Sequence, residues 1–520
     1  MSLDACHPQY LEFQESWRIM EDCYAGPRRI KSLGPVYLPP TRGMIRDGAL
    51  LSNLRNRFTG DGYGVTYVND WYFLRRGSGV PDGETRYWDY LKRAVFYNYV
   101  REAVKIGIGV MHHKPPTIEL PNAMQDMVKS ASVRGESMAM LLRRINVQQL
   151  VLGRLGLFLD LPKETQERGR ERPYIVLYRA PQIINWDDGE SEELTLPKLN
   201  LVVLDESAAQ RTGDFEWETV EQHRVLVMGN LEVNEPRARY KAGVFTKEEG
   251  FRPDGLKPPV VRGKPLDEIP FVICNACDHE SAPEEPPLMG LAEVALAIYR
   301  GDADYRQTLH EQANATLVVI GGAGDPEKPQ ALGAGAKIDV LTGGDAKYIS
   351  APAEGIEGQR QALVDDKMLA AEQAGQLIDS RSGQKEGAET LRIRVAAQTA
   401  TLNEIALTGA AALKKLLQTA AVWLGADPEE VIVEPNLDFD GARMTGQELV
   451  QLMTAKGLGA PLSKRSIHAQ MRQGELTQLE FEEEESELEG EVDLPAGGGL
   501  PDDDPDQSMP KDPDDDDPEE

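Results

Sequence analysis

Apolar and polar positions alternate with helical spacing through most of the first 160 residues. Aromatic and apolar side chains recur every three or four residues from His7 to Ala25, which predicts a helix ending at Gly26-Pro27. The same spacing predicts one long helix over Tyr87 to Val110, with Asn98 and Glu102 on its apolar stripe, and another from about Asn122 to Ile145. A short apolar strand is expected from Gly156 to Leu161.

The pattern changes to a period of two between Tyr174 and Asn275. Short β-branched runs such as YIVLYR, LNLVVLDE, HRVLVMG and FVICN are bounded by Gly, Pro and Asp, which predicts a sheet. A linker follows at Glu280 to Pro287, and a strong helix is expected from about Leu288. Its inward positions are predicted to be Leu291, Ala295, Ile298, Tyr305 and Leu309.

Strand-like runs then lead into a second helix, predicted over Gly355 to Asp379. Its inward residues are expected to be Ile356, Leu363, Val364, Met368, Ala371 and Ile378. Beyond Arg381 the chain is Ala-rich and helical in pattern to Leu424, and a last helical unit spans Thr445 to about Glu484. Helices, a sheet, a helix–small sheet–helix segment and further helices make a segregated α+β protein.

The charge of the chain is concentrated at its end. The 520 residues carry a net charge of −30, of which −19 lies between Glu480 and Glu520, so the rest carries −11. An acidic body excludes a broad basic clamp on nucleic acid. The last residues, GGGLPDDDPDQSMPKDPDDDDPEE, have almost nothing to bury and are expected to be disordered.

No run of about 18 uncharged apolar residues is found, so we expect no membrane-spanning helix and no membrane partner. The N-terminal residues lack the basic start and apolar run of a secretory signal, and the chain has four cysteines. Both features favour a reducing cytoplasm.

Catalytic motifs are weak. Neither a P-loop nor a G-x-S-x-G elbow occurs. His310-Glu311 begins an H-E-x-x-H pattern, but Asn314 stands where the second histidine is needed. His112-His113 is interpreted as an exposed helix end with no clustered ligands. We therefore predict no enzyme, no cofactor and no metal.

One constellation keeps an enzymatic alternative open. Cys274 and Cys277 form C-N-A-C, followed by His279, which could be half of a zinc site or a thiol pair. A structural zinc needs four ligands, and the other cysteines, Cys6 and Cys23, are far away in sequence. The alternative is a cytoplasmic thiol- or zinc-dependent enzyme.

The segment PPLMGLAEVALAIYRGDADYRQTLHEQANATLVVIGG resembles the portal proteins of tailed bacteriophages. The matching positions are Pro287, Leu288, Ala292, Ala303 and the small-residue exit from Thr316 to Gly322. Near the end, Ser463, Arg472, Gly474 and Glu482 to Glu485 follow the family's C-terminal pattern. Collinear segments extend the resemblance from about Trp17 to Glu489, as in a divergent branch of that family, whereas the insertion from Gly60 to Gly83 has no counterpart.

The resemblance implies a portal-protein fold and a closed ring, typically dodecameric, at one capsid vertex. In family terms the parts are residues 1–173, a mostly helical wing part; 174–287, the β-rich wing; 288–316, stem helix 1; 317–352, the clip; 353–380, stem helix 2; 381–444, the tunnel loop and a helical region; 445–489, the crown; and 490–520, a disordered acidic tail.

The same resemblance implies a non-enzymatic channel for double-stranded DNA during packaging and ejection, and a nucleator of head assembly. Implied partners are further copies of the chain, the terminase large subunit, major capsid and scaffold proteins, head–tail adaptors and DNA bound without sequence specificity. The location would be the virion, with the host cytoplasm during assembly. A different virion or scaffold protein that shares only helical character is a further alternative.

Two groups of candidate site residues follow. Tunnel-loop candidates are Arg381, Lys385, Arg392 and Arg394, although these could equally be exposed helix charges paired with Glu386 and Glu389. Clip candidates for terminase or connector contact are Asp325, Lys328, Lys337, Asp345 and Lys347. The acidic tail either repels entering DNA or recruits a basic partner, or it only solubilises the chain.

Overall fold

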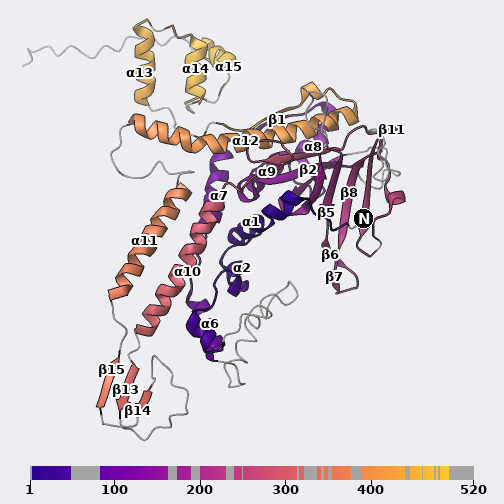
Figure 1. Cartoon of the computed structure of the whole chain (residues 1–520). Coiled ribbons are helices and arrows are strands. Elements are labelled where there is room, and N and C mark those ends of the chain that lie inside the picture. Colours follow the sequence, from indigo (N-terminus) through magenta and orange to yellow (C-terminus); the bar gives the residue numbers. More distant parts are fainter. Residues whose placement is uncertain are drawn as a thin grey trace, which may run out of the picture. The chain divides into compact units, whose positions relative to one another are not determined.

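The computed structural model combines helices with several small sheets, as the sequence predicts for an α+β protein (Figure 1). Residues 3–48, 82–161, 173–188, 199–229, 239–248, 250–312, 316–320, 337–340, 345–349, 354–375, 388–437, 439, 446–459, 461–473, 476–477, 479 and 481–490 are described. The chain divides into two compact units, Met1–Phe439 and Asp440–Glu520.

The first predicted helix is confirmed as α1, Pro8–Ala25. The side chain of His7 caps it by accepting from the backbone N–H of Gln9, and Gly26 at φ 97° ends it. Trp17 and Met20 are fully buried on its inner face. Short elements follow: α2 (Pro27–Ser32), η1 (Gly34–Val36) and α3 (Arg42–Arg46).

The prediction of one long helix over 87–110 is wrong, because the segment forms two helices. They are α6 (Asp82–Arg93) and α7 (Tyr99–Met111). The carboxylate of Asp302 accepts from the backbone N–H of Val95 at 3.2 Å, and Asn98 caps α7 by accepting from Arg101 N at 3.0 Å. These side chains satisfy backbone donors that a continuous helix would have paired internally.

The predicted helix over 122–145 is also wrong. The segment contains η2 (Asn122–Met124) and α8 (Gln125–Lys129), and α9 runs later, over Met138–Leu152. Gly135 at φ 74° makes the turn, and Ser137 starts α9 by accepting from the N–H of Met140. Turn and cap residues therefore override the apolar spacing here.

Two antiparallel sheets occupy the region of period-two patterning. The three-stranded sheet has the order β12-β2-β3, formed by Phe271–Asn275, Arg154–Asp160 and Tyr174–Arg179. The four-stranded sheet has the order β4-β5-β8-β9, formed by Ile183–Asp187, Leu201–Asp205, Gln222–Met228 and Tyr240–Thr246. The apolar runs are confirmed as strands, whereas β9 and two small hairpins were not predicted; the hairpin strands are β6 (Ala208–Arg211), β7 (Trp217–Val220), β10 (Val260–Val261) and β11 (Lys264–Pro265).

The second half of the larger unit is built on long helices. They are α10 (Met289–Gln312), α11 (Glu354–Gly375) and α12 (Ala388–Leu424), with strands β13 (Thr316–Ile320), β14 (Lys337–Val340) and β15 (Asp345–Ile349) between the first two. After η5 (Pro428–Glu430), strand β16 (Ile432–Glu434) pairs with β1 (Thr117–Glu119), far away in sequence. This pairing ties the end of the unit to its N-terminal third.

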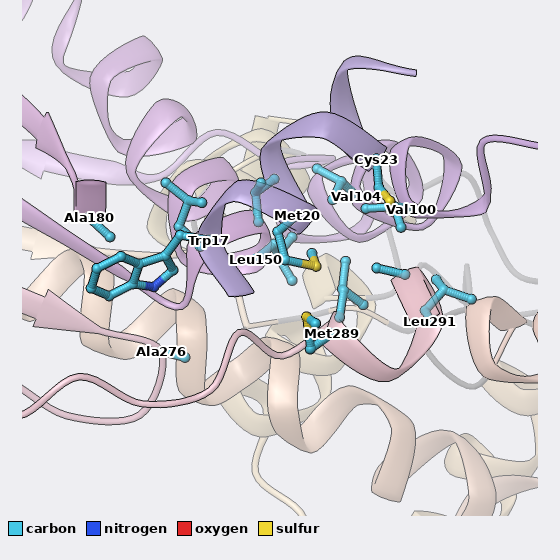
Figure 2. Close-up of a cluster of buried hydrophobic side chains, with 14 of the residues drawn as sticks. Trp17, Met20, Cys23, Val100, Val104, Leu150, Ala180, Ala276, Met289 and Leu291 are labelled. Atoms are coloured by element: carbon cyan, nitrogen blue, oxygen red, sulfur yellow. The ribbon is translucent and has the colours of Figure 1, made fainter. Parts of the chain in front are cut away.

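One buried cluster joins the N-terminal helices to the start of α10. Figure 2 shows Trp17, Met20 and Cys23 of α1 with Val100 and Val104 of α7, and with residues of α9 and α10. A second cluster packs α12 against α9 and the three-stranded sheet, around Leu142, Leu157 and Leu413. Both clusters draw on residues far apart in the sequence, so distant described parts of the larger unit pack together.

One helix bears on the expectation that the chain has no membrane-spanning segment. Within the described residues, Ala400–Leu424 of α12 is long and apolar enough to cross a membrane by length and composition alone. Glu404, Lys414 and Lys415 interrupt this segment, so it contains no uncharged run of about 18 residues. In the fold, 61% of the apolar window is buried inside the protein, as in the core helix of a soluble domain.

The smaller unit contains α13 (Gly446–Gly457), α14 (Lys464–Gln473) and α15 (Phe481–Gly490). Helices α14 and α15 are joined by an ion pair of 2.6 Å between Arg465 Nη2 and Glu482 Oε1. The ring of Phe481 also stacks edge-on against His468, with 5.4 Å between the centroids. The predicted interruption of this helical unit near Gly457 is confirmed.

Candidate functional site

Helix α10 is fixed to the N-terminal helices by polar contacts as well as by its apolar face. The Tyr90 hydroxyl donates to Asp304 Oδ1 at 2.6 Å, and Arg300 Nε donates to the carbonyl of Tyr37 at 3.1 Å. Burial and the contact with Asp304 raise the pKa of the Tyr90 hydroxyl well above its usual range. The phenol is therefore a permanent donor that holds α10 in place.

Asp302 links three elements. It is 2% exposed, and its Oδ2 accepts from Val95 N at 3.2 Å and from Arg306 Nε at 2.6 Å. Lys367 of α11 lies 4.0 Å from Oδ1 and sits over the ring of Tyr97 at 4.4 Å. A buried carboxylate with these partners fixes α11 to α10 and to the start of α7.

A close approach between α10 and α11 lies one residue away. A Cβ at Gly301 would be 3.1 Å from Leu363 Cδ2, and Leu363 is buried. Glycine thus lets the leucine side chain of α11 rest against the backbone of α10. The two helices run side by side in opposite directions, and the chain passes through the small sheet between them (Figure 1).

That small sheet has the order β14-β13-β15. The central strand β13 pairs in parallel with β14 and antiparallel with β15. A parallel pair needs a crossover connection, and the residues between these two strands, 321–336, lie outside the described part of the chain. The helix–small sheet–helix segment expected from the sequence is therefore present.

The outer side of α11 differs from the prediction. Leu363 is buried as expected, but Val364 and Met368 are 37% and 65% exposed, and Ala371 is exposed too. Val364, Met368 and Ala371 are spaced by four and three residues, so they form an exposed apolar stripe along one face of α11. Leu369 is exposed too, about 100° farther around the helix. The helix was predicted correctly from the apolar spacing, but the described residues bury only some of its apolar side chains. Similarly, Leu309 at the end of α10 is 39% exposed.

Buried polar side chains hold the middle of α12. Asn146 Nδ2 donates to the carbonyl of Ile405 at 3.3 Å and to Gln149 Oε1 at 2.9 Å. His112 Nε2 lies 2.8 Å from Asn146 Oδ1, which extends the chain of contacts to α7. Gly409 faces this group, and a Cβ there would be 2.6 Å from Gln149 Oε1. The contacts fix α12 against α9 and α7.

Only some of the predicted site residues lie in the described part of the chain. Lys337 begins β14 opposite Leu317, Asp345 begins β15 opposite Ile320, and Lys347 lies opposite Val318. Arg392 and Arg394 are in the first turns of α12. Arg381, Lys385, Asp325 and Lys328, like the tail and the 60–83 insertion, lie outside the described residues.

The cysteine constellation does not form an activated thiol. Cys274 is fully buried, which raises the pKa of its thiol, and it accepts from Gln149 Nε2 at 3.3 Å. Partial burial and the carboxylates of Glu404 and Glu284 raise the pKa of Cys277 to about 11. His279 Nε2 instead contacts the carbonyl of Thr408 at 3.0 Å.

Thiol and metal chemistry both lack support in the described part of the chain. All four cysteines are free, and no group of three or more His, Cys, Asp or Glu side chains is arranged to hold a metal ion among the described residues. Reactive cysteines need a lowered pKa, and both thiols of the C-N-A-C sequence have a raised one. The enzymatic alternative is therefore not favoured.

Sequence reasoning missed the residues that organise this region. Asp302, Gly301 and Gly409 lie inside segments that were predicted to be helical. No role beyond the helix was predicted for these three residues. A buried aspartate within an apolar helical face, and glycines in helix interiors, are signals that could have drawn attention to close helix contacts.

Comparisons with known proteins cover the same region. The family described as "Domain of unknown function (DUF4055)" matches residues 287–424, from just before α10 to the last residue of α12. No curated protein sequence matches the chain.

Two of the solved structures similar to the chain come from the necks of GTA (gene transfer agent) particles. A chain in the neck of a native particle computed with C12 symmetry has 14% identity and a TM-score of 0.32, covering 72% of this chain and 89% of that one. A chain in the neck of an empty particle computed with C6 symmetry has 15% identity and a TM-score of 0.33, covering 71% and 88%.

Proposed function

We propose that this chain is a phage-type portal protein, one copy of a closed ring that conducts double-stranded DNA into and out of a capsid. The helix–small sheet–helix segment followed by the long helix α12 supports the proposal, because this order is the one in which the sequence resembles portal proteins. The proposed role is structural and not enzymatic.

The observation that carries the proposal is the exposed apolar stripe of α11. Val364, Met368 and Ala371 lie on one face of a helix that Asp302 and Gly301 fix firmly to α10. A rigid helix with apolar side chains facing water is a usual mark of a protein interface. When one surface meets a different surface on the next copy, a suitable rotation closes the assembly into a ring.

Within such a ring, α10 and α11 would be the stem and strands β13–β15 the clip. The clip would contact the terminase motor during packaging and a head–tail adaptor afterwards, with Lys337, Asp345 and Lys347 as candidate contacts. The β-rich wing and the smaller C-terminal unit would face capsid and scaffold proteins. Assembly in the host cytoplasm would precede incorporation in the virion.

The charge of the chain suits transit of DNA rather than retention. Outside the acidic tail the net charge is only −11, so the ring as a whole would have weak affinity for phosphates. Arg392 and Arg394, near the start of α12, are candidates for the few basic positions along the channel. Each contact between a basic side chain and a DNA phosphate releases a counterion and adds binding affinity. A channel with few such contacts would therefore bind DNA weakly and let it slide.

A charge placed in the α11 stripe tests the proposal. Met368→Glu puts a carboxylate at the more exposed of the two larger side chains in the stripe, where ring closure would bury it. We expect the variant to sediment as a monomer under conditions in which the unaltered chain forms rings, with an unchanged far-UV circular dichroism spectrum.

Met140→Glu is the matched control, since Met140 of α9 is 63% exposed, close to the 65% of Met368, and lies outside α11. The control is expected to assemble normally. Rings of Met368→Glu that form as readily as those of the control would contradict the role assigned to the stripe.

A further inference from the structure

Strands β5 and β8 continue beyond the four-stranded sheet as a projecting hairpin. Asp205 pairs with His223 at the end of β5 and β8, and Ala208 pairs with Val220 at the start of β6 and β7. The register is the same on both sides of the junction, and Glu206 N donates to Gln222 O at 2.9 Å between them. We call residues 208–220 the arm; Figure 1 shows it extending past the ends of β5 and β8.

The tip of the arm is ordered. Thr212 N donates to Glu216 O at 3.0 Å, and Arg211 Nε donates to Gly213 O at 2.9 Å, while its Nη2 donates to Asp214 O. These contacts close the loop without any apolar packing.

Two aromatic side chains nevertheless face the solvent there. Phe215 is 92% exposed and Trp217 is 66% exposed, and every residue of β6 is exposed. A two-stranded hairpin alone is marginally stable in water, and two aromatic rings left in water add no stabilisation from burial. Aromatic residues on a protrusion are typical anchors of a protein interface.

The arm is acidic around its aromatic residues. Asp214, Glu216 and Glu218 flank them, and the one base, Arg211, is engaged with the loop carbonyls. The surface that receives the arm must therefore combine apolar contact area with positive charge.

The chain itself offers such a surface at the edge of the same sheet. Residues 239–264, which include the edge strand β9, contain seven bases and three acids. Val244 and Val260 are 36% and 49% exposed there, and Arg252 and Lys257 are exposed too. Lys257 bridges to Ala242 of β9, two residues from Val244, so both lie on the same face of this edge. We call residues 239–264 the basic edge.

We propose that the arm of one copy docks on the basic edge of a second copy of this chain. Phe215 and Trp217 would cover Val244 and Val260. Glu218 alternates with Trp217 along β7 and lies on the opposite face of the arm. The acids would therefore act through the overall negative charge of the arm near Arg252 and Lys257, and not through direct pairs. The contact joins two different surfaces, as head-to-tail rings require. It rests on the proposed ring assembly, and it adds a second interface, in the wing, to the one assigned to α11.

Charge reversal on each side tests whether the arm and the basic edge meet each other. The arm variant is Glu216→Lys with Glu218→Lys, the edge variant is Arg252→Glu with Lys257→Glu, and the combined variant carries all four. Glu429→Lys with Glu430→Lys is the matched control, since both glutamates are exposed and lie outside the arm and the basic edge. Sedimentation velocity gives the self-association of the full chain, and the thermal midpoint shows that each variant is folded.

We expect the arm and edge variants to self-associate about tenfold more weakly than the control, and the combined variant to recover. Arm and edge variants that associate like the control would overturn the docking proposal and leave the ring intact. Weakening by both without recovery in the combined variant would also overturn it, because the two surfaces would then have different partners. An unaltered chain that stays monomeric at every concentration would overturn the ring and the docking together.

Discussion

The surroundings of Cys277 make its thiol a poor nucleophile, although the C-N-A-C sequence suggested a reactive thiol pair. Partial burial and the carboxylates of Glu404 and Glu284 raise its pKa to about 11, although the residue is exposed. At neutral pH its thiolate fraction is then about a hundredfold lower than that of a thiol with a pKa near 9.

Alkylation kinetics test this residue. We expect iodoacetamide to modify Cys277 much more slowly than a free cysteine near neutral pH, with a rate that rises tenfold per pH unit up to about pH 11. Cys277→Ser serves as the control that identifies the labelled site by mass spectrometry. A rate that levels off below about pH 8 would mean an activated thiol and would revive the enzymatic alternative.

His112 gives the protein a pH dependence of known sign. Burial lowers the pKa of His112 and Arg143 adds to the effect, while the hydrogen bond to Asn146 opposes it. The unfolded chain then binds a proton at a pH where the folded chain does not, so stability falls as the pH drops through about 6.5.

The substitution His112→Gln removes the titratable imidazole and keeps a hydrogen-bond donor for Asn146 Oδ1. We expect the thermal midpoint of the variant to fall less than that of the unaltered chain between about pH 7.5 and about pH 5. The pKa of His7 is lowered too, chiefly by burial, so part of the acid sensitivity should remain in the variant. Equal losses in the two proteins would show that His112 does not contribute.

At the scale of single elements, α12 depends on a glycine that ordinary helix propensity would disfavour. A Cβ at Gly409 would be 2.6 Å from Gln149 Oε1 and 2.7 Å from Asn146 Nδ2. The substitution Gly409→Ala would therefore displace buried hydrogen-bonded side chains, and we expect it to destabilise the fold by about 1–3 kcal/mol.

Gly109 of α7 is the matched control, because a Cβ there meets nothing within 4 Å. Gly109→Ala should stabilise the protein by about 0.5–1 kcal/mol through helix propensity alone. Urea denaturation of both variants measures the two free energies of unfolding. A stabilising effect of Gly409→Ala would contradict the packing of α12 described above.

The elements that local patterns predicted well are those whose ends carry local signals. Helix α1 has its cap and its Gly-Pro stop, and the strands with β-branched runs were placed correctly. The long helix predicted over 87–110 failed because Asp302, some 200 residues away, binds the N–H of Val95. No pattern near Val95 contains that information.

In the candidate site, too, local features could be predicted from the sequence, whereas contacts between distant residues could not. The helix–small sheet–helix segment could be predicted from periodicity and turn residues, since each element is local. The contact between Gly301 and Leu363 could not, because it depends on which faces of α10 and α11 meet. The arm was missed because its strands are polar and alternate with few apolar residues.

At the scale of the whole molecule, exposed apolar groups appear on two separate elements of the larger unit. The α11 stripe and the arm each place large apolar side chains in water, and each belongs to an element whose backbone is well fixed. A chain that needs two such surfaces is suited to a closed ring, where every copy offers both to its neighbours. In the proposed ring, the acidic balance of the chain would keep DNA from being held tightly.

Native mass spectrometry of the purified chain, with negative-stain images of the same sample, decides whether the chain forms a closed ring. We predict a single closed assembly of about twelve copies of the 57.5 kDa chain, with end views that show a central opening. A monomer or a two-fold symmetric dimer at all concentrations, with no ring in the images, would rule out the proposed portal ring.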